Sequence, residues 1–149
     1  MNADDMYNKA LKEASKENVD IELTLNLLNK AIEKGSLKAC YALGTWYLYG
    51  NNVEKDLIKA IDLLEKASKG NIPEACFDLA VCYETGEAVT KDEYRAFKLY
   101  LQGALWGDKQ SCYEVGRCYY YGIGIAEDKR IGNIWIDRAE FLGIKEEIE

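Results

Sequence analysis

Every periodic run of hydrophobic residues in this chain has the spacing of an α-helix. One run lies on a single face of a helix with 3.6 residues per turn, because its members stand at i, i+4, i+8 and i+11: Ala39, Leu43, Tyr47 and Gly50. A second run follows with the same kind of spacing: Ala60, Leu63, Leu64 and Ala67. No alternating run of strand length occurs, so the pattern predicts an all-α fold.

The ends of these two helices carry residues that stop or start a helix. Gly50 ends the first run, and glycine is favoured just past a helix C-terminus because it adopts a left-handed backbone without strain. Asp56 stands just before the second run, where a carboxylate accepts from unpaired backbone N–H groups and meets the favourable end of the helix dipole. The sequence therefore predicts one helix from Ala39 to about Gly50 and another that ends near Gly70.

This pair of helices recurs with a period of 36 residues, which is the length of a helical repeat. The stretches 39–44, 75–80 and 111–116 superpose without a gap, and the match continues through the later positions of each copy. The recurring tyrosine, glycine and aspartate are Tyr47, Tyr83 and Tyr119, then Gly50, Gly86 and Gly122, then Asp56, Asp92 and Asp128. A weaker copy precedes them, so we expect one repeat domain over 1–149, with repeats at 3–38, 39–74, 75–110 and 111–146 and a tail at 147–149.

A helix pair of this kind cannot bury both of its apolar faces alone, so successive pairs must stack into a solenoid. The pattern A-x-x-x-L-G-x-x-Y-x-x-G-x-x-V-x-x-D-x-x-K-A, which runs from Ala39 to Ala60, resembles the Sel-1-like repeat family, a relative of the tetratricopeptide repeats. The resemblance implies a right-handed α/α superhelix of four helix-turn-helix repeats. Two departures are visible: Ala80 replaces the family glycine, and Ile131-Gly132 replaces Lys-Ala in the last copy.

Composition excludes several kinds of site. The 149 residues include no His, which removes the Ser/His/Asp and Cys/His catalytic arrangements and every metal site that depends on imidazole. Nucleophile-elbow and P-loop patterns are also missing from the sequence. We therefore expect a protein that is not an enzyme and that has no catalytic residues, no metal site and no cofactor.

Charge and hydropathy bound the partners and the compartment. The formal net charge is -7, and the sequence offers no basic surface of the kind that nucleic acid or anionic lipid requires. No signal-peptide pattern opens the chain, and no apolar run approaches the roughly 20 residues of a membrane span. We expect a cytoplasmic protein with a protein or peptide partner, without nucleic-acid or membrane binding.

The five cysteines are predicted to be reduced core residues: Cys40, Cys76, Cys82, Cys112 and Cys118. A secreted, cysteine-rich branch of the Sel-1-like family, with members described as β-lactamases, pairs a Cys of each second helix with a Cys that starts the next first helix. In this chain the second-helix positions hold Ile32, Ser68 and Ala104 or Leu105. The partner cysteines of that branch are therefore missing, and a β-lactamase-like hydrolase is the least favoured alternative.

An aromatic stripe is the main candidate for a binding surface. At about 100° per residue, Tyr41 and Leu48 lie on the side of the first helix opposite Ala39 and Tyr47, so we expect that side to be exposed unless something covers it. In tetratricopeptide-like solenoids the first helices line the concave surface, and the resemblance places the stripe there. The candidate partner-binding residues are Tyr41, Tyr49, Phe77, Tyr113, Arg117, Tyr120 and Tyr121. Packing against neighbouring helices is the alternative role, above all for Tyr41 and Phe77.

Two functions other than the hydrolase follow from these observations. The first is a non-enzymatic scaffold or adaptor that holds a peptide or protein on its concave aromatic face. An inhibitor or immunity-type protein that blocks a toxin or effector is an alternative, and no residue separates it from the first. We also expect weak self-association through the C-terminal repeat, where Ile131, Ile134 and Trp135 have no following helix to cover them.

Overall fold

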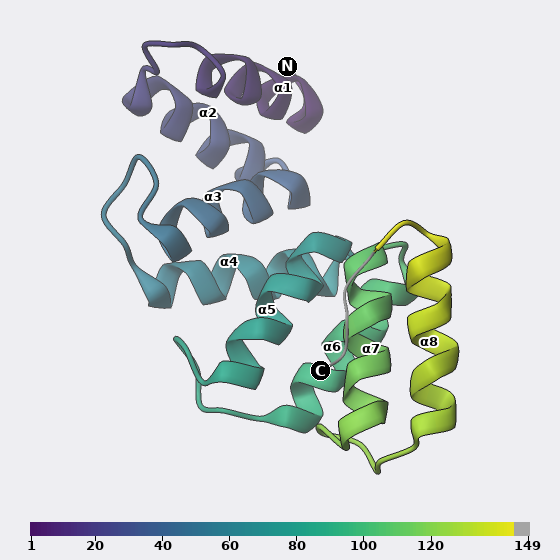
Figure 1. Cartoon of the computed structure of the whole chain (residues 1–149). Helices are drawn as coiled ribbons and strands as arrows, with labels where there is room; N and C mark the ends of the chain where they lie inside the picture. The colour runs from purple at the N-terminus through teal and green to yellow at the C-terminus, as the bar shows by residue number, and fades with distance from the viewer. Residues whose placement is uncertain (145–149) are drawn as a thin grey trace. The chain divides into compact units, whose positions relative to one another are not determined.

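The computed structural model describes residues 1–144, and this part of the chain folds into α-helices joined by short turns (Figure 1). The helices are α1 (Ala3–Ala14), α2 (Ile21–Glu33), α3 (Leu37–Tyr49), α4 (Leu57–Lys69), α5 (Pro73–Thr85), α6 (Glu93–Leu105), α7 (Lys109–Tyr121) and α8 (Lys129–Phe141). From α4 onward, each helix starts 36 residues after its counterpart in the previous repeat. The predicted all-α class and the helix-turn-helix repeat are confirmed.

Each second helix begins at the predicted aspartate. The carboxylate of Asp56 accepts a hydrogen bond from the backbone N–H of Lys59 at 3.1 Å, and the three equivalent bonds are each 3.0 Å long. Their aspartates are Asp20, Asp92 and Asp128. The first helices α3, α5 and α7 end at the predicted glycines, each with a positive φ.

The first helix of the weak repeat forms although its apolar pattern is poor. Asn2 caps α1 by accepting from the backbone N–H of Asp5 at 2.8 Å, and the Asp5 carboxylate accepts from the N–H of Asn2. This reciprocal pair satisfies two backbone donors that the start of a helix leaves unpaired. Ala10 of α1 is fully buried.

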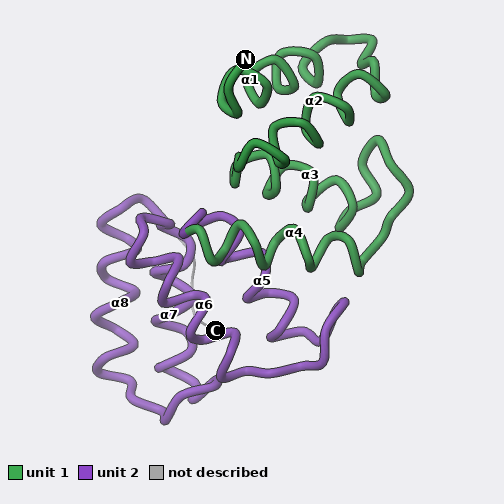
Figure 2. Tube along the Cα trace, turned by 180° about the vertical axis from the view of Figure 1, so that it is seen from behind, with its two compact units in different colours: residues 1–70 green, residues 71–149 purple. Residues whose placement is uncertain are grey.

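The chain divides into two compact units, residues 1–70 and residues 71–149 (Figure 2). Each unit contains two helix pairs with their own core. In the first unit the buried aliphatic residues include Leu28 and Leu64, and in the second they include Leu79 and Val115.

Small residues bring the two helices of the last pair close together. A Cβ added to Gly116 of α7 would lie 2.9 Å from the carbonyl oxygen of Gly132 in α8, and one added to Gly132 would meet the backbone of Tyr120. Gly132 stands where the second helices of the two preceding repeats carry Ala60 and Ala96, and the absence of a side chain there allows this close approach.

Candidate functional site

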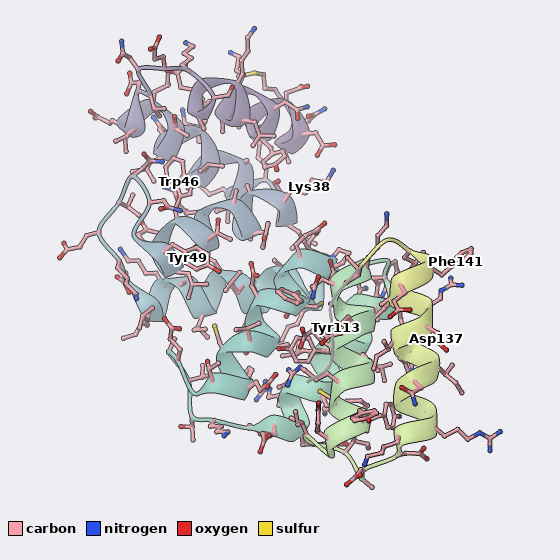
Figure 3. All side chains as sticks on the ribbon, viewed as in Figure 1. Lys38, Trp46, Tyr49, Tyr113, Asp137 and Phe141 are labelled. Carbon is pink, nitrogen blue, oxygen red and sulfur yellow. The ribbon has the colours of Figure 1, made fainter. Side chains whose placement is uncertain are left out.

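The candidate aromatic residues differ in how much of each side chain solvent can reach. Tyr49 on α3 and Tyr121 on α7 are exposed, at 61% and 45%. Tyr41, Phe77 and Tyr120 are half-buried. Within the first unit, Tyr49 ends α3 at the turn toward α4 (Figure 3). Tyr49 and Tyr121 are therefore the predicted aromatic residues whose side chains a partner can reach most easily.

The expected exposure is wrong at two positions of the stripe. Tyr113 is only 6% exposed and Leu48 only 5% exposed. Tyr113 belongs to a core cluster with Ile136 of α8, and Leu142 and Ile144, which follow α8, pack against the same cluster. A helical wheel of α7 cannot show this cover, because it comes from chain about 30 residues further along.

Arg117 is held by two carboxylates. Its Nη2 lies 2.5 Å from Oε1 of Glu84 on α5, and its Nε donates to Oε2 of Glu114 on α7 at 2.8 Å. All three side chains are less than a quarter exposed. Burial lowers the pKa of Arg117, but the hydrogen bond to Glu84 and the charge of Glu114 outweigh it, so the pKa is raised above its ordinary value. The guanidinium is therefore fixed as a cation, with its donors directed into the protein.

Tyr100 extends this network into the core of the second unit. It is 2% exposed, and its hydroxyl donates to Oε1 of Glu84 at 3.0 Å. Burial, followed by the negative charge of Glu84, raises the pKa of Tyr100. The Tyr100 ring meets the ring of Phe77 edge-on at a centroid distance of 5.8 Å. The packing alternative therefore has direct support for Phe77.

Tyr120 and Tyr121 form a small aromatic platform near the end of α7. Their ring centroids lie 5.0 Å apart at an interplanar angle of 71°, an edge-to-face contact. The ammonium group of Lys129 lies 5.4 Å from the centroid of the Tyr120 ring. These contacts hold the exposed Tyr121 ring against a half-buried neighbour.

In two repeats, a basic residue of the second helix lies over the ring of the recurring tyrosine of the first helix. Lys59 of α4 lies over the ring of Tyr47 at 5.3 Å, and Arg95 of α6 lies over the ring of Tyr83 at 4.8 Å. In the last repeat the basic residue is replaced by Ile131, and Tyr119 instead meets the ring of Phe97 edge-on at 5.3 Å. These cation–π contacts stabilise the repeat by about 1 kcal/mol or less each.

The cysteines lie inside the two units as small core residues. All five are buried, and no disulfide joins them within residues 1–144. Burial raises the pKa of Cys76 and of Cys82 to about 11, and that of Cys118 to about 12. The nucleophilic thiolate form is therefore strongly disfavoured at neutral pH.

The sequence singled out Arg117 but missed the groups that hold it. Glu114 precedes Arg117 by three residues on one helix, and that spacing is a readable signal for an ion pair. Glu84 and Tyr100 lie on two other helices, and no local spacing connects them to Arg117. Within residues 1–144 no group of three or more Cys, Asp or Glu side chains is arranged to hold a metal ion. In the same residues no helix is both long and apolar enough to cross a membrane.

The architecture defines the class of protein: an α-solenoid built from stacked helix-turn-helix repeats. The family model of the Sel1 repeat matches residues 13–36, 37–72, 73–108 and 109–139. The chain belongs to the Sel1 repeat family, and the predicted resemblance is confirmed. The matched repeats begin with the first helices α3, α5 and α7, two residues before the boundaries expected from the sequence.

Solved structures of bacterial proteins have the same fold. A Sel1 repeat protein from Oxalobacter formigenes is 32% identical, with a TM-score of 0.76 over 81% of this chain and 91% of that one. A protective antigen of uropathogenic Escherichia coli strains is 25% identical, with a TM-score of 0.90 over 96% of this chain. An immunity protein from Pseudomonas aeruginosa is also 25% identical, with a TM-score of 0.64 over 95% of this chain.

The chain spans 31% of the Escherichia coli protein and 53% of the Pseudomonas protein. No match is found among curated proteins. Sel1 repeat proteins are generally scaffolds for protein interaction, and they are mostly not enzymes.

Proposed function

We propose that this protein is a non-enzymatic interaction module that holds a peptide or protein partner on aromatic side chains of its first helices. The observation that carries the proposal is Tyr121, which is 45% exposed while its ring rests edge-on against the half-buried Tyr120. A tyrosine offers a large apolar area and a hydroxyl at low entropic cost, and one held in place loses little freedom on binding.

The seven candidate residues take different parts in this proposal. Tyr121 and Tyr49 are the exposed contacts, one in each compact unit. Tyr41, Phe77 and Tyr120 are half-buried, and Tyr120 contacts the ring of Tyr121. Tyr113 and Arg117 then act as positioning residues, since one is buried and the other is bound by Glu84 and Glu114. All seven predicted residues keep a role in this proposal, and those that contact the partner are distinguished from those that position them.

Three features support a binding role over catalysis. The sequence has no His and no nucleophile motif, and burial raises the pKa of every cysteine thiol. Family membership points the same way, because Sel1 repeat proteins are mostly scaffolds. We propose that the protein needs no cofactor and works in the cytoplasm, where buried thiols remain reduced.

An immunity-type role is a second candidate. Its support is the likeness to Pseudomonas aeruginosa immunity proteins over 95% of this chain, at 25% identity. In this role the partner is a toxin or effector that the protein blocks. Co-expression distinguishes the two roles, because an immunity protein restores growth to cells that produce its toxin, whereas an adaptor does not.

Weak self-association through the last repeat is also part of the proposal. On α8, Ile134 is 60% exposed and Phe141 is 83% exposed. Asp137 lies on the same helix between them (Figure 3). Trp135 differs from the expectation, since it is half-buried and packs against the cluster of Tyr113 and Ile136. Sedimentation velocity over a range of concentrations tests this part directly.

The exposed candidate tyrosines of the first helices are called the tyrosine surface, and its test compares two exposed tyrosines. Tyr121→Ala is expected to weaken capture of the partner by at least about tenfold, because an aromatic anchor contributes about 2 kcal/mol or more to an interface. Tyr94→Ala is the matched control, since Tyr94 is 58% exposed on the second helix α6. Both variants should keep the melting temperature of the parent protein within about 2 °C. Equal capture by the two variants would contradict the proposal.

A further inference from the structure

A lysine-rich surface pocket lies in the first compact unit, between α1 and α2. Lys9 and Lys12 stand at i and i+3 on α1, so they share one side of that helix, and Lys16 lies just beyond its C-terminal end. Together with Glu13 of α1 and with Leu23 and Leu27 of α2, they line a pocket of about 300 Å³. A second pocket, of about 350 Å³, continues along α1 and shares Lys9 and Lys12 with it.

Two of these lysines have no carboxylate partner. Lys16 pairs with the nearly buried Glu13 at 2.6 Å. Lys9 and Lys12 are exposed, and neither forms an ion pair within residues 1–144. The pocket therefore presents two positive charges that form no ion pair, in a chain whose net charge is -7, and Asp5 lines the adjoining pocket.

The other wall of the pocket is apolar. Leu23 is 43% exposed, and Leu27 one turn further along α2 is half-buried. An exposed leucine in a concave site remains in contact with water until another apolar group covers it. Leu23 and Leu27 are spaced i, i+4 on α2, and Lys9 and Lys12 are spaced i, i+3 on α1. This surface is complementary to an amphipathic helix that carries apolar and acidic residues on one side.

We propose that this pocket is a second interaction surface, which binds an acidic amphipathic segment of a protein partner. The apolar side chains of the segment cover Leu23 and Leu27, and its carboxylates face Lys9 and Lys12. Phosphate-rich partners fit less well, because two uncompensated lysines in an acidic chain cannot neutralise a long phosphate backbone or an anionic membrane. The proposal does not rest on the tyrosine surface, since none of the seven candidate residues lines this pocket.

The test measures the fluorescence anisotropy of a labelled synthetic peptide of roughly 14 residues, with Leu and Glu at helical spacing. The full chain is expected to bind this peptide, and affinity should fall as salt is raised. A peptide with the same leucines and with Lys in place of Glu should bind at least about tenfold more weakly. A peptide with Glu but without Leu should also bind more weakly, because it cannot cover the apolar wall.

Two charge-reversal variants locate the binding. Lys9→Glu with Lys12→Glu should weaken binding of the Leu/Glu peptide by at least about tenfold. Lys91→Glu with Lys109→Glu gives the same change in net charge at two exposed lysines of the second unit and should leave the affinity within about twofold. Circular dichroism confirms that both variants are folded, and Leu23→Ala provides a variant that retains all charges.

Several results would overturn the proposal. One is that the folded parent chain does not bind the Leu/Glu peptide. Another is that the two double variants lose the same amount of peptide affinity. A third is that the peptide affinity is unchanged in the Lys9→Glu/Lys12→Glu variant and also in Leu23→Ala. Binding to phosphatidylserine vesicles that is lost in the Lys9→Glu/Lys12→Glu variant, without peptide binding, would assign the pocket to a membrane instead. None of these results bears on Tyr121, so each surface stands or fails by its own measurement.

Discussion

Arg117 Nη2 lies 2.5 Å from Glu84 Oε1, an ion pair that links α7 to α5 across 33 residues of sequence. Since both side chains are less than a quarter exposed, replacing Arg117 by Met strands the two carboxylates that it neutralises. We expect Arg117→Met to lower the free energy of unfolding by about 2 kcal/mol, measured by urea denaturation.

A double-mutant cycle separates the ion pair from other effects of the substitution. Glu84→Gln, Arg117→Met and the double variant should give a coupling energy of about 1 kcal/mol or more. The exposed pair of Asp62 and Lys66, at 3.2 Å, is the control and should give about 0.5 kcal/mol or less. A coupling near zero for Glu84 and Arg117 would mean that the pair adds nothing to stability.

Gly116 and Gly44 occupy the same position in two repeats but have different surroundings. A Cβ on Gly116 would meet the side chain of Ile136 at 2.6 Å and the backbone of Gly132 at 2.9 Å, whereas one on Gly44 meets only leucine side chains at 3.3 Å. We expect Gly116→Ala to destabilise the protein by about 2 kcal/mol, and Gly44→Ala to change stability by less than about 1 kcal/mol. Thermal and urea unfolding of both variants measure the difference, and a loss of stability in Gly116→Ala no larger than that in Gly44→Ala would contradict this expectation.

Stability should fall in alkaline solution because of the buried thiols. Their pKa is raised in the folded chain, to about 11 for Cys82 and about 12 for Cys118, against 9.0 as the ordinary value. A group with a raised folded pKa contributes its stability below the unfolded pKa and loses it as the pH rises toward the folded pKa. The free energy of unfolding should therefore decline between about pH 9 and pH 12.

The size of this decline can be traced to one thiol. In Cys118→Ala the decline should be shallower by on the order of 1 kcal/mol per pH unit over part of this range, although the variant starts from lower stability because it creates a small cavity. An identical pH dependence in the parent protein and in Cys118→Ala would show that this thiol does not titrate on unfolding.

The cysteines should react as thiols only when the protein unfolds. With iodoacetamide at neutral pH and without reductant, the native protein should label slowly, because all five cysteines are buried and burial raises the pKa of their thiols. In denaturant the mass should increase by five labels. A protein that takes up two labels fewer would contain a disulfide, and the proposal of a reducing compartment would then be wrong.

Local signals in the sequence determined the repeat. Asp56 and its counterparts cap the second helices, and Gly50, Gly86 and Gly122 end the first ones, through interactions that span only a few residues. The 36-residue period carries these signals from copy to copy, which is why helix positions could be predicted closely. In α1 the local pair of Asn2 and Asp5 starts a helix where the apolar pattern is weak.

Tertiary structure alone decided which candidate residues are available to a partner. Tyr113 and Tyr121 share α7, yet Tyr113 is buried in a cluster with residues of α8 and of the segment after it, while Tyr121 remains exposed. Arg117 is fixed by Glu84, and the pocket beside Lys9 and Lys12 depends on leucines of another helix. Helical periodicity gives the direction of a side chain from its own helix axis. What covers or pairs that side chain depends on distant residues, and these come together only when the helices pack.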